Sequence, residues 1–170
     1  MRSEVPDRIG WAVDLLDPQP HHRVLEIGCG PGVAAGVIAD RLANGHLLAI
    51  DRSPTAIDRA TRRNRRHIDS GRTEFRRTEL AHLAKSGPFD AVVAMNVNLF
   101  WTGPAEPEWR VLDAVLARPG MLLLTYGYGS NGPSGRTADV ESGITAALHR
   151  HGYATTTATA DGSWAIAGRR

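Results

Sequence analysis

One short segment of this sequence combines glycines with a carboxylate in a way that could bind a ligand. It reads EIGCGPG over residues 26–32 and lies between an apolar run and a helical segment. Glycines let the backbone turn tightly and approach a ligand closely, and the helix that follows offers unpaired N–H groups. Asp51 comes 19 residues after Gly32, at the end of the next apolar run, where a carboxylate can accept hydrogen bonds from ribose hydroxyls. Together these features predict a nucleoside-binding site; the alternative is a tight turn with a helix-capping aspartate.

The residues around the glycines indicate which nucleoside would fit. A dinucleotide-binding turn reads GxGxxG or GxGxxA, with a small sixth residue that lets helix and strand pack closely. Here the sixth residue is Val33, and Glu26 stands two residues before the first glycine. A carboxylate at that place would repel a pyrophosphate and would suit a ligand that carries positive charge nearby. The sequence therefore favours a cationic nucleoside over a dinucleotide.

The elements that must position these residues follow from an alternation of short apolar runs with longer helical segments. Such runs, without strict period-two patterning, are typical of a parallel sheet that is buried on both faces. An Asp-Gly pair between the last two runs is a strong hairpin signal. We therefore expect an α/β fold with a mostly parallel sheet and an antiparallel hairpin at one edge. The expected strands are Arg23–Gly28, His46–Asp51, Thr73–Arg77, Phe89–Met95, Met121–Tyr126, Tyr153–Ala160 and Ser163–Gly168, and the expected helices are Pro6–Leu16, Val33–Ala43, Pro54–Ile68, Pro107–Ala117 and Ala138–His151.

These motifs resemble those of a known family, the class I S-adenosylmethionine-dependent methyltransferases. Three segments carry the resemblance: VLEIGCGPG (Val24–Gly32), AIDRS (Ala49–Ser53) and FDAVVAMN (Phe89–Asn96). The first is quite specific, whereas the other two match mainly by their order and distances. The order of elements is similar to the family's over essentially the whole chain. The resemblance implies a doubly wound, mostly parallel seven-stranded sheet with a C-terminal antiparallel hairpin, the Rossmann-like methyltransferase fold.

The resemblance also implies S-adenosyl-L-methionine as the cofactor and a role for each matching residue. The motif acid Glu26 would help to anchor the ammonium group of the cofactor, and Asp51 would bind its ribose hydroxyls. Glu79 would face the adenine amino group, with the Leu80 backbone beside the ring, although Thr78-Glu79 stands where the family usually has Gly-Asp. A plain glutamate at a helix N-terminus is the alternative there. The expected cofactor-binding residues are Glu26, Gly28, Cys29, Gly30, Gly32, Asp51, Arg52, Ser53, Glu79, Leu80, Met95 and Asn96.

The residues that would bind the methyl acceptor are less clearly marked. No Asn-Pro-Pro-Tyr or Asp-Pro-Pro-Tyr follows the fourth strand, which disfavours amino groups of bases or of glutamine, and no carboxylate cluster indicates a metal site. Candidates stand at the carboxyl ends of the fourth and fifth strands, where ligands bind in open α/β sheets. Packing against the sheet is the alternative role for the aromatic candidates, and residues 127–136 form either a lid or a plain connection. The candidates are Asn96, Asn98, Trp101, Tyr126 and Tyr128.

Length and composition bound the class of protein. A chain of 170 residues with 42% apolar and 22% charged residues is typical of one packed domain and excludes a disordered protein. We expect a single domain over residues 1–170, with an N-terminal helix in residues 1–20 packed near the cofactor site. The N-terminus lacks the apolar core of a signal peptide, and no run approaches the roughly 18 apolar residues of a membrane helix. Cys29 is the single cysteine, so no internal disulfide is expected and the expected location is the cytoplasm.

The positive charge is carried almost wholly by arginine. Nine arginines and histidines fall between Arg59 and Arg77. This segment could bind nucleic acid, but Phe75 is the only Phe, Tyr or Trp among the arginines, which favours the solvated face of a helix.

The sequence thus predicts an S-adenosylmethionine-dependent methyltransferase that acts on a small-molecule acceptor and needs no metal ion. A protein or nucleic-acid acceptor stays open, because no segment is long enough to form a cap over the site. Two other classes of function also stay open: a non-catalytic partner protein that binds S-adenosylmethionine, and an NAD-dependent oxidoreductase. The methylated atom, the use of a general base and the oligomeric state are not predicted.

Overall fold

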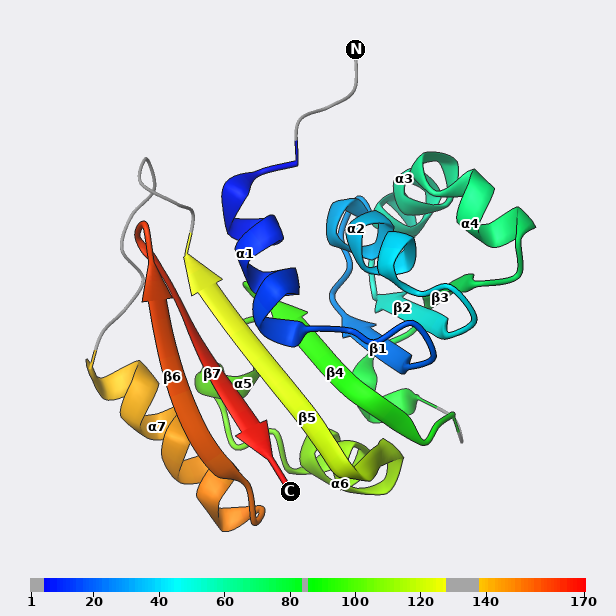
Figure 1. The fold of residues 1–170 in the computed structure, drawn as a ribbon. Coiled ribbons are helices and arrows are strands. Elements are labelled where there is room, and N and C mark those ends of the chain that lie inside the picture. The colour runs from blue at the N-terminus through cyan, green and yellow to red at the C-terminus, as the bar shows by residue number, and fades with distance from the viewer. Residues whose placement is uncertain (1–4, 84–85, 128–137) are drawn as a thin grey trace.

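The computed structural model describes residues 5–83, 86–127 and 138–170. In these residues seven strands form one sheet in the order β3-β2-β1-β4-β5-β7-β6 (Figure 1). The first five strands along the chain run parallel, whereas β7 pairs antiparallel with both β5 and β6. This arrangement confirms the expected parallel sheet with a C-terminal hairpin. The strands are β1 (Arg23–Ile27), β2 (His46–Asp51), β3 (Thr73–Arg77), β4 (Phe89–Met95), β5 (Leu116–Gly127), β6 (Ala154–Ala160) and β7 (Ser163–Arg169).

Helices cover both faces of the sheet, which explains why the central strands are almost continuously apolar. Successive side chains of a strand point to opposite faces, so Val24 and Leu25 enter different cores. The core around Val24 contains Val13 of α1, Ile38 of α2 and Ala60 of α3, and the core around Leu25 is closed by α6 and α7. The helices are α1 (Asp7–Leu16), α2 (Val33–Arg41), α3 (Pro54–Arg63), α4 (Arg65–Asp69), α5 (Leu99–Thr102), α6 (Glu106–Val115) and α7 (Ala138–Arg150), with a short 3₁₀ helix at Leu80–His82.

The order of the strands creates a crevice between β1 and β4. The chain passes outward from β1 to β2 and β3, then crosses back to β4 on the other side of β1. The connections after β1 and β4 therefore diverge, and ligands of open α/β sheets bind in such a crevice, at the carboxyl ends of the strands. The glycine-rich segment follows β1 and Asn96 follows β4, so both lie at this crevice.

The helix expected over Pro54–Ile68 is broken into α3 and α4, so that prediction was wrong. The break is at Asn64, whose side chain is buried. Its amide donates hydrogen bonds to the carbonyl oxygens of Gly32 and Ala60, at 2.8 and 3.0 Å. A contact with the glycine-rich turn, 32 residues away in sequence, thus sets the end of α3.

Strand β5 begins earlier than expected, at Leu116 in place of Met121, before the Pro119-Gly120 pair. Leu116 is buried and pairs with Phe89, and the register then shifts so that Met121 pairs with Ala91. The proline lies in this irregular stretch, where its missing N–H interrupts no regular ladder. The segment between β4 and α6, where no helix or strand was expected, also contains the short helix α5.

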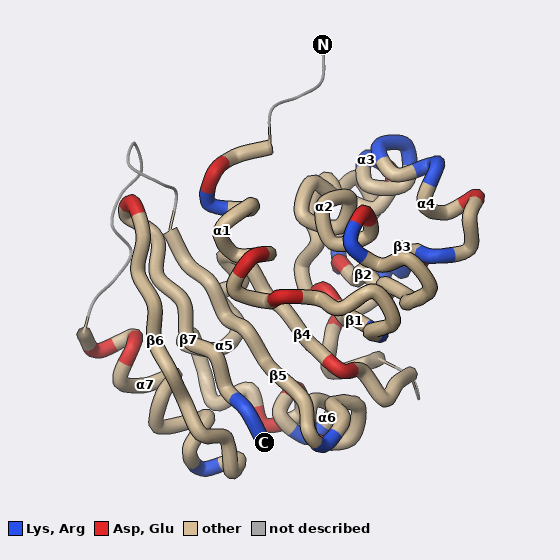
Figure 2. The backbone as a smooth tube through the Cα atoms, in the orientation of Figure 1, with Lys and Arg blue, Asp and Glu red and all other residues tan. Residues whose placement is uncertain are grey.

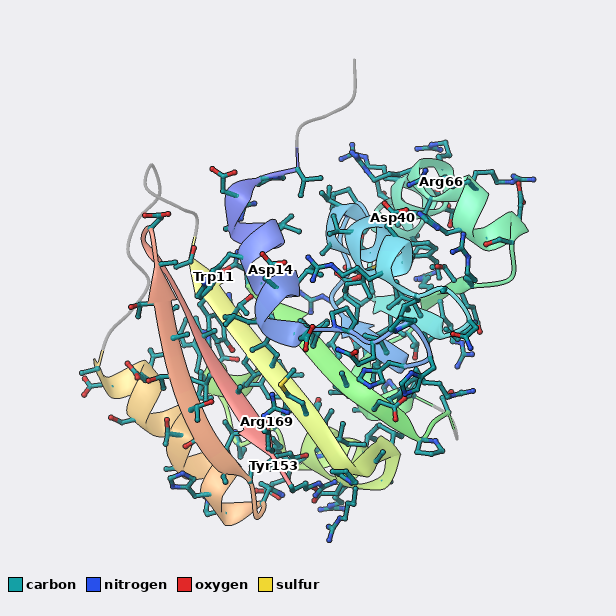
Figure 3. The ribbon with its side chains drawn as sticks, viewed as in Figure 1. Trp11, Asp14, Asp40, Arg66, Tyr153 and Arg169 are labelled. Carbon is teal, nitrogen blue, oxygen red and sulfur yellow. The ribbon has the colours of Figure 1, made fainter. Side chains whose placement is uncertain are left out.

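The arginine-rich segment lies on α3, α4 and β3 at the surface (Figure 2). Several of its arginines bind carboxylates of this chain. Arg66 of α4 lies 2.7 Å from Asp40 of α2 (Figure 3), and Arg65 lies 3.0 Å from Asp69. These exposed pairs favour the interpretation as a solvated helix face.

Candidate functional site

The segment after β1 forms a tight turn because three of its glycines adopt left-handed backbone angles. The φ angle is +69° at Gly28, +52° at Gly30 and +74° at Gly32, a region that residues with a side chain rarely occupy. A Cβ at Gly32 would lie 2.8 Å from the Cβ of Ala60, so this glycine lets the turn pack on α3. A Cβ at Gly30 would meet no atom within 4 Å. The turn therefore packs against a helix at one glycine and presents open backbone at another.

Asp51, at the end of β2, ties this turn to α3. Its Oδ2 atom accepts a hydrogen bond from the Gly30 N–H at 2.9 Å, and its Oδ1 atom accepts one from the Ser53 N–H at 2.8 Å. Ser53 in turn caps α3, because its Oγ atom accepts a hydrogen bond from the Ala56 N–H at 3.3 Å. A carboxylate has about four acceptor positions, so lone pairs of Asp51 stay available to hydroxyl groups of a ligand.

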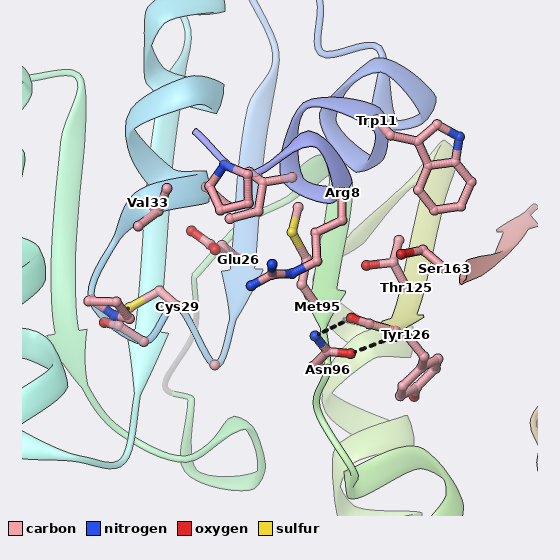
Figure 4. A pocket seen from close by; sticks show the side chains of 17 residues that line it. Arg8, Trp11, Glu26, Cys29, Val33, Met95, Asn96, Thr125, Tyr126 and Ser163 are labelled. Carbon is pink, nitrogen blue, oxygen red and sulfur yellow. Dashed lines mark hydrogen bonds between the residues drawn. The ribbon is translucent and has the colours of Figure 1, made fainter. Parts of the chain in front are cut away.

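Two cavities open along the carboxyl ends of the strands. We name them the Glu26 cavity, which lies beside α1 (Figure 4), and the Asp51 cavity. Gly28, Met95 and Asn96 line both, so the cavities meet at the end of β4. The Glu26 cavity is also lined by Pro6, Arg8, Ile9, Trp11, Glu26, Cys29, Gly30, Pro31, Val33, Ala34, Thr125, Tyr126, Gly127 and Ser163. The Asp51 cavity is also lined by Ile27, Ile50, Asp51, Arg52, Thr78, Glu79, Leu80, Val97, Asn98, Leu99, Thr102 and Glu108.

Glu26 is the acidic residue of the Glu26 cavity, and it is almost wholly buried. The residue is only 2% exposed, and its Oε2 atom forms no hydrogen bond with any residue that the structure describes. Burial, and secondarily the charge of Asp51, raises the pKa of Glu26 from 4.5 to about 8. An unpaired buried carboxylate is costly, and a cationic group beside it would relieve that cost. The site therefore suits a ligand with an ammonium group.

Asn96 and Tyr126 form the wall where β4 and β5 end. The Asn96 side chain donates a hydrogen bond to the Gly127 carbonyl and accepts one from the Gly127 N–H, both at 2.9 Å (Figure 4). The Tyr126 hydroxyl donates to the Val97 carbonyl at 3.2 Å, and its ring stacks on Trp164 with centroids 4.7 Å apart. Burial raises the pKa of the Tyr126 hydroxyl. Both side chains are thus engaged with the protein itself, and they shape the cavity more than they offer free polar groups.

The structure brings most of the expected site residues together along the two cavities. Cys29 lines the Glu26 cavity as a buried free thiol whose pKa is raised by burial. Asn98 lines the Asp51 cavity, whereas Trp101 is 44% exposed and lines neither cavity. Tyr128 and the rest of the expected lid, apart from Gly127, lie outside the described residues. Gly32 and Ser53 support the site from α2 and α3 and line neither cavity.

The sequence analysis missed several lining residues, among them Arg8, Trp11, Thr125 and Ser163. Arg8 and Trp11 come from α1, and their spacing of three places them on one face of that helix. Thr125 lies near the end of β5, and Ser163 begins β7, which runs antiparallel to β5 and so starts at the ligand edge. The helical spacing of Arg8 and Trp11 was a usable signal, whereas nothing local marked Ser163.

The described residues contain neither a metal-binding cluster nor a membrane-spanning helix. In residues 5–83, 86–127 and 138–170, no group of three or more His, Cys, Asp and Glu side chains could hold a metal ion. In the same ranges, no helix has the length and apolar character that crossing a bilayer requires.

Comparison with known proteins gives one family match and two curated relatives. Residues 24–120 match a family model described as a methyltransferase domain. Protein-L-isoaspartate O-methyltransferase of Methanopyrus kandleri is 38% identical over 54 residues, which are 31% of this chain and 24% of that protein. Trans-aconitate 2-methyltransferase of Streptomyces avermitilis is 27% identical over 84 residues, which are 49% of this chain and 31% of that protein. The chain thus spans between about a quarter and a third of the length of these relatives.

A solved structure extends the similarity over nearly the whole chain. Magnesium protoporphyrin IX methyltransferase from Synechocystis PCC 6803, a structure with bound S-adenosylmethionine, superimposes with a TM-score of 0.67. The two share 21% identity, and the match covers 98% of this chain and 77% of the other. At this identity the similarity concerns the fold, and it confirms the expected Rossmann-like methyltransferase architecture.

Proposed function

Since this chain belongs to the family of methyltransferase domains, we propose that it binds S-adenosylmethionine and transfers the methyl group to a small-molecule acceptor. When bound, this cofactor supplies a methyl group on a sulfonium centre, which a nucleophile can accept. The observation that carries the proposal is the buried, unpaired Glu26 carboxylate beside the glycine turn. This carboxylate fits the ammonium group at the amino-acid end of the cofactor.

The Asp51 cavity fits the nucleoside end of the same ligand. Both oxygens of Asp51 keep acceptor positions after bonding the backbone, and these would receive the ribose hydroxyls. Glu79 and the start of the 3₁₀ helix at Leu80 line the same cavity, where an adenine amino group would find an acceptor. Met95 and Asn96 stand where the two cavities meet and would flank the middle of the ligand.

The residues that line the Glu26 cavity are better suited to position the two reactants than to accept a proton from the acceptor. The Tyr126 hydroxyl already donates to Val97, and burial raises its pKa, so it is poorly suited to act as a base. Glu26 is committed to the ammonium in this proposal. Holding two reactants in line can supply about 7–11 kcal/mol of the barrier, so an acceptor that is nucleophilic without a base would suffice. A cavity walled by α1 and by strand ends also suits a small molecule more than a polymer.

The test is calorimetric titration with S-adenosylmethionine, S-adenosylhomocysteine and NADH. We expect micromolar binding of the two adenosyl ligands and none of NADH. Asp51→Asn keeps one oxygen for the backbone but removes the charge, and we expect about 10- to 100-fold weaker binding, as for a charge-assisted hydrogen bond. Asp58→Asn, an exposed position on α3 outside both cavities, is the matched control and leaves binding unchanged.

Methyl transfer is then measured with labelled cofactor against small molecules, peptides and RNA. Label in the small-molecule pool supports the proposal. Label found only in peptide or RNA shows that the acceptor is a polymer. Tight cofactor binding without transfer to any pool favours a non-catalytic binding protein. Binding of NADH in place of the adenosyl ligands overturns the cofactor assignment.

A further inference from the structure

Arg8 brings a positive charge into the Glu26 cavity. It is half-buried in the first turn of α1, and its guanidinium points from the helix toward the space between Glu26 and Asn96 (Figure 4). Within the part of the chain that the structure describes, Arg8 forms no hydrogen bond and no ion pair, although Glu26 lines the same cavity. The cavity therefore holds a guanidinium that no carboxylate of the described residues neutralises.

A structural role does not explain Arg8. A cation in the first turn of a helix meets the positive end of the helix dipole, which is unfavourable. Helix α1 is held to the body by burial of Val13 and Leu16, and by Arg41, which donates to the Val13 carbonyl and to Asp14. None of these contacts involves Arg8. Its position is therefore best understood through what occupies the cavity.

The groups that face Arg8 are suited to a negative charge. The wall away from Glu26 is formed by Thr125, Tyr126 and Ser163, which are neutral (Figure 4). The Ser163 hydroxyl is buried, and its Oγ atom has no hydrogen-bond partner among the described residues, so it can donate a hydrogen bond to a ligand. A ligand carrying only an ammonium group would satisfy Glu26 but would leave the guanidinium without a counter-charge. A ligand assembly that also carries an anionic group satisfies both.

We propose that Arg8 binds a carboxylate in the Glu26 cavity. The inference rests on the proposed function, because it takes the ligand at Glu26 to be the methyl donor. The planar guanidinium can donate two parallel hydrogen bonds to a carboxylate. That carboxylate belongs either to the amino-acid end of the cofactor or to the acceptor, and the two sources require the same chemistry at Arg8.

The experiment compares Arg8→Ala and Arg8→Lys with Arg110→Ala, an exposed arginine of α6 outside both cavities. The first arm measures binding of S-adenosylhomocysteine and of 5′-methylthioadenosine, which lacks the amino-acid end. The second arm measures transfer of labelled methyl groups to a panel of small carboxylic acids and their primary amides. Thermal unfolding checks the fold, and we expect Arg8→Ala to melt at or above the wild-type temperature, because it removes an unfavourable helix charge.

Each outcome either identifies the carboxylate that Arg8 binds or overturns the inference. If the cofactor's carboxylate is bound, Arg8→Ala weakens S-adenosylhomocysteine about 10- to 100-fold and leaves 5′-methylthioadenosine unchanged, with a smaller loss for Arg8→Lys. If the acceptor's carboxylate is bound, both adenosyl ligands are unaffected and the preference for acids over amides is lost. Unchanged binding together with no acid preference in the wild type, or one that survives Arg8→Ala, overturns the inference. Failure of the wild type to bind S-adenosylhomocysteine refutes the proposed function itself.

Discussion

Replacing Glu26 with glutamine should make the ligand-free protein more stable at pH 8 and should weaken the binding of the ligand. Burial and the charge of Asp51 raise the pKa of Glu26 to about 8, against 4.5 ordinarily. The folded chain therefore holds a proton that the unfolded chain has released between these pH values. Stability from this residue is complete below pH 4.5 and is lost as the pH rises to about 8. Glu26→Gln removes the titrating group, so the variant does not lose this stability as the pH rises.

The size of the effect follows from the same two pKa values. The interval from 4.5 to 8, at about 1.36 kcal/mol per pH unit, corresponds to about 5 kcal/mol of unfolding free energy. Between pH 5 and pH 8 the expected change is about 4 kcal/mol. The buried amide of glutamine costs about 1–3 kcal/mol at every pH, because it too lacks partners. We therefore expect the variant to be similar to or weaker than the wild type at pH 5 and more stable at pH 8.

Urea unfolding of wild type and Glu26→Gln from pH 5 to pH 9 measures this difference directly, since the other titrating groups are common to both chains. Glu106→Gln, exposed on α6, reports the effect of losing a surface carboxylate. In the wild type, binding of S-adenosylhomocysteine should release close to one proton below pH 8, and in Glu26→Gln none. A stability difference that stays constant within about 1 kcal/mol across the range would refute the reasoning.

Three further predictions concern the walls of the site. Asn96→Ala loses both side-chain hydrogen bonds to Gly127 at the end of β5, and chemical denaturation should show a loss of about 1–3 kcal/mol, whereas Asn98→Ala should show less than 1 kcal/mol. Gly32→Ala should lower the melting temperature more than Gly71→Ala does; both have a φ near +74°, but only at Gly32 would a Cβ lie 2.9 Å from the α3 backbone, so equal losses would contradict the packing argument. Trp101→Ala should change unfolding free energy by less than about 0.5 kcal/mol and leave S-adenosylhomocysteine affinity unchanged, and a large loss in either would show a buried or ligand-bound role for this exposed residue.

The sequence predicted best those elements whose own residues show the apolar pattern of a buried strand or helix. Strands β2 and β4 have the expected bounds, because strands covered on both faces are nearly uninterrupted apolar runs between turn signals. The bounds that were wrong depend on distant contacts. Asn64 ends α3 because it reaches the turn at Gly32, and Leu116 starts β5 early because it pairs with Phe89. Neither contact leaves a trace in the neighbouring sequence.

The residues of the site divide in the same way, into those marked by a local sequence pattern and those placed by distant contacts. Glu26, the glycines and Asp51 were expected together because a turn between a strand and a helix is a local structure with local requirements. Arg8 and Ser163 reach the cavity from elements whose placement depends on packing over the sheet. No spacing rule connects the first helix with the last strand, so only the structure shows that Arg8 and Ser163 line the same cavity.

The antiparallel direction of β7 has a consequence for how the protein could change its substrate. Because Ser163 pairs with Gly127, the turn at Asp161-Gly162 lies at the edge of the sheet formed by the carboxyl ends of the parallel strands, where the glycine turn also lies. The donor would be held by β1 and β2, while the neighbouring space is bounded by a surface hairpin. Insertions at the tip of a hairpin are usually tolerated. Under the proposed function, the space for the acceptor beside β7 can therefore change while the donor-binding turn after β1 is left untouched.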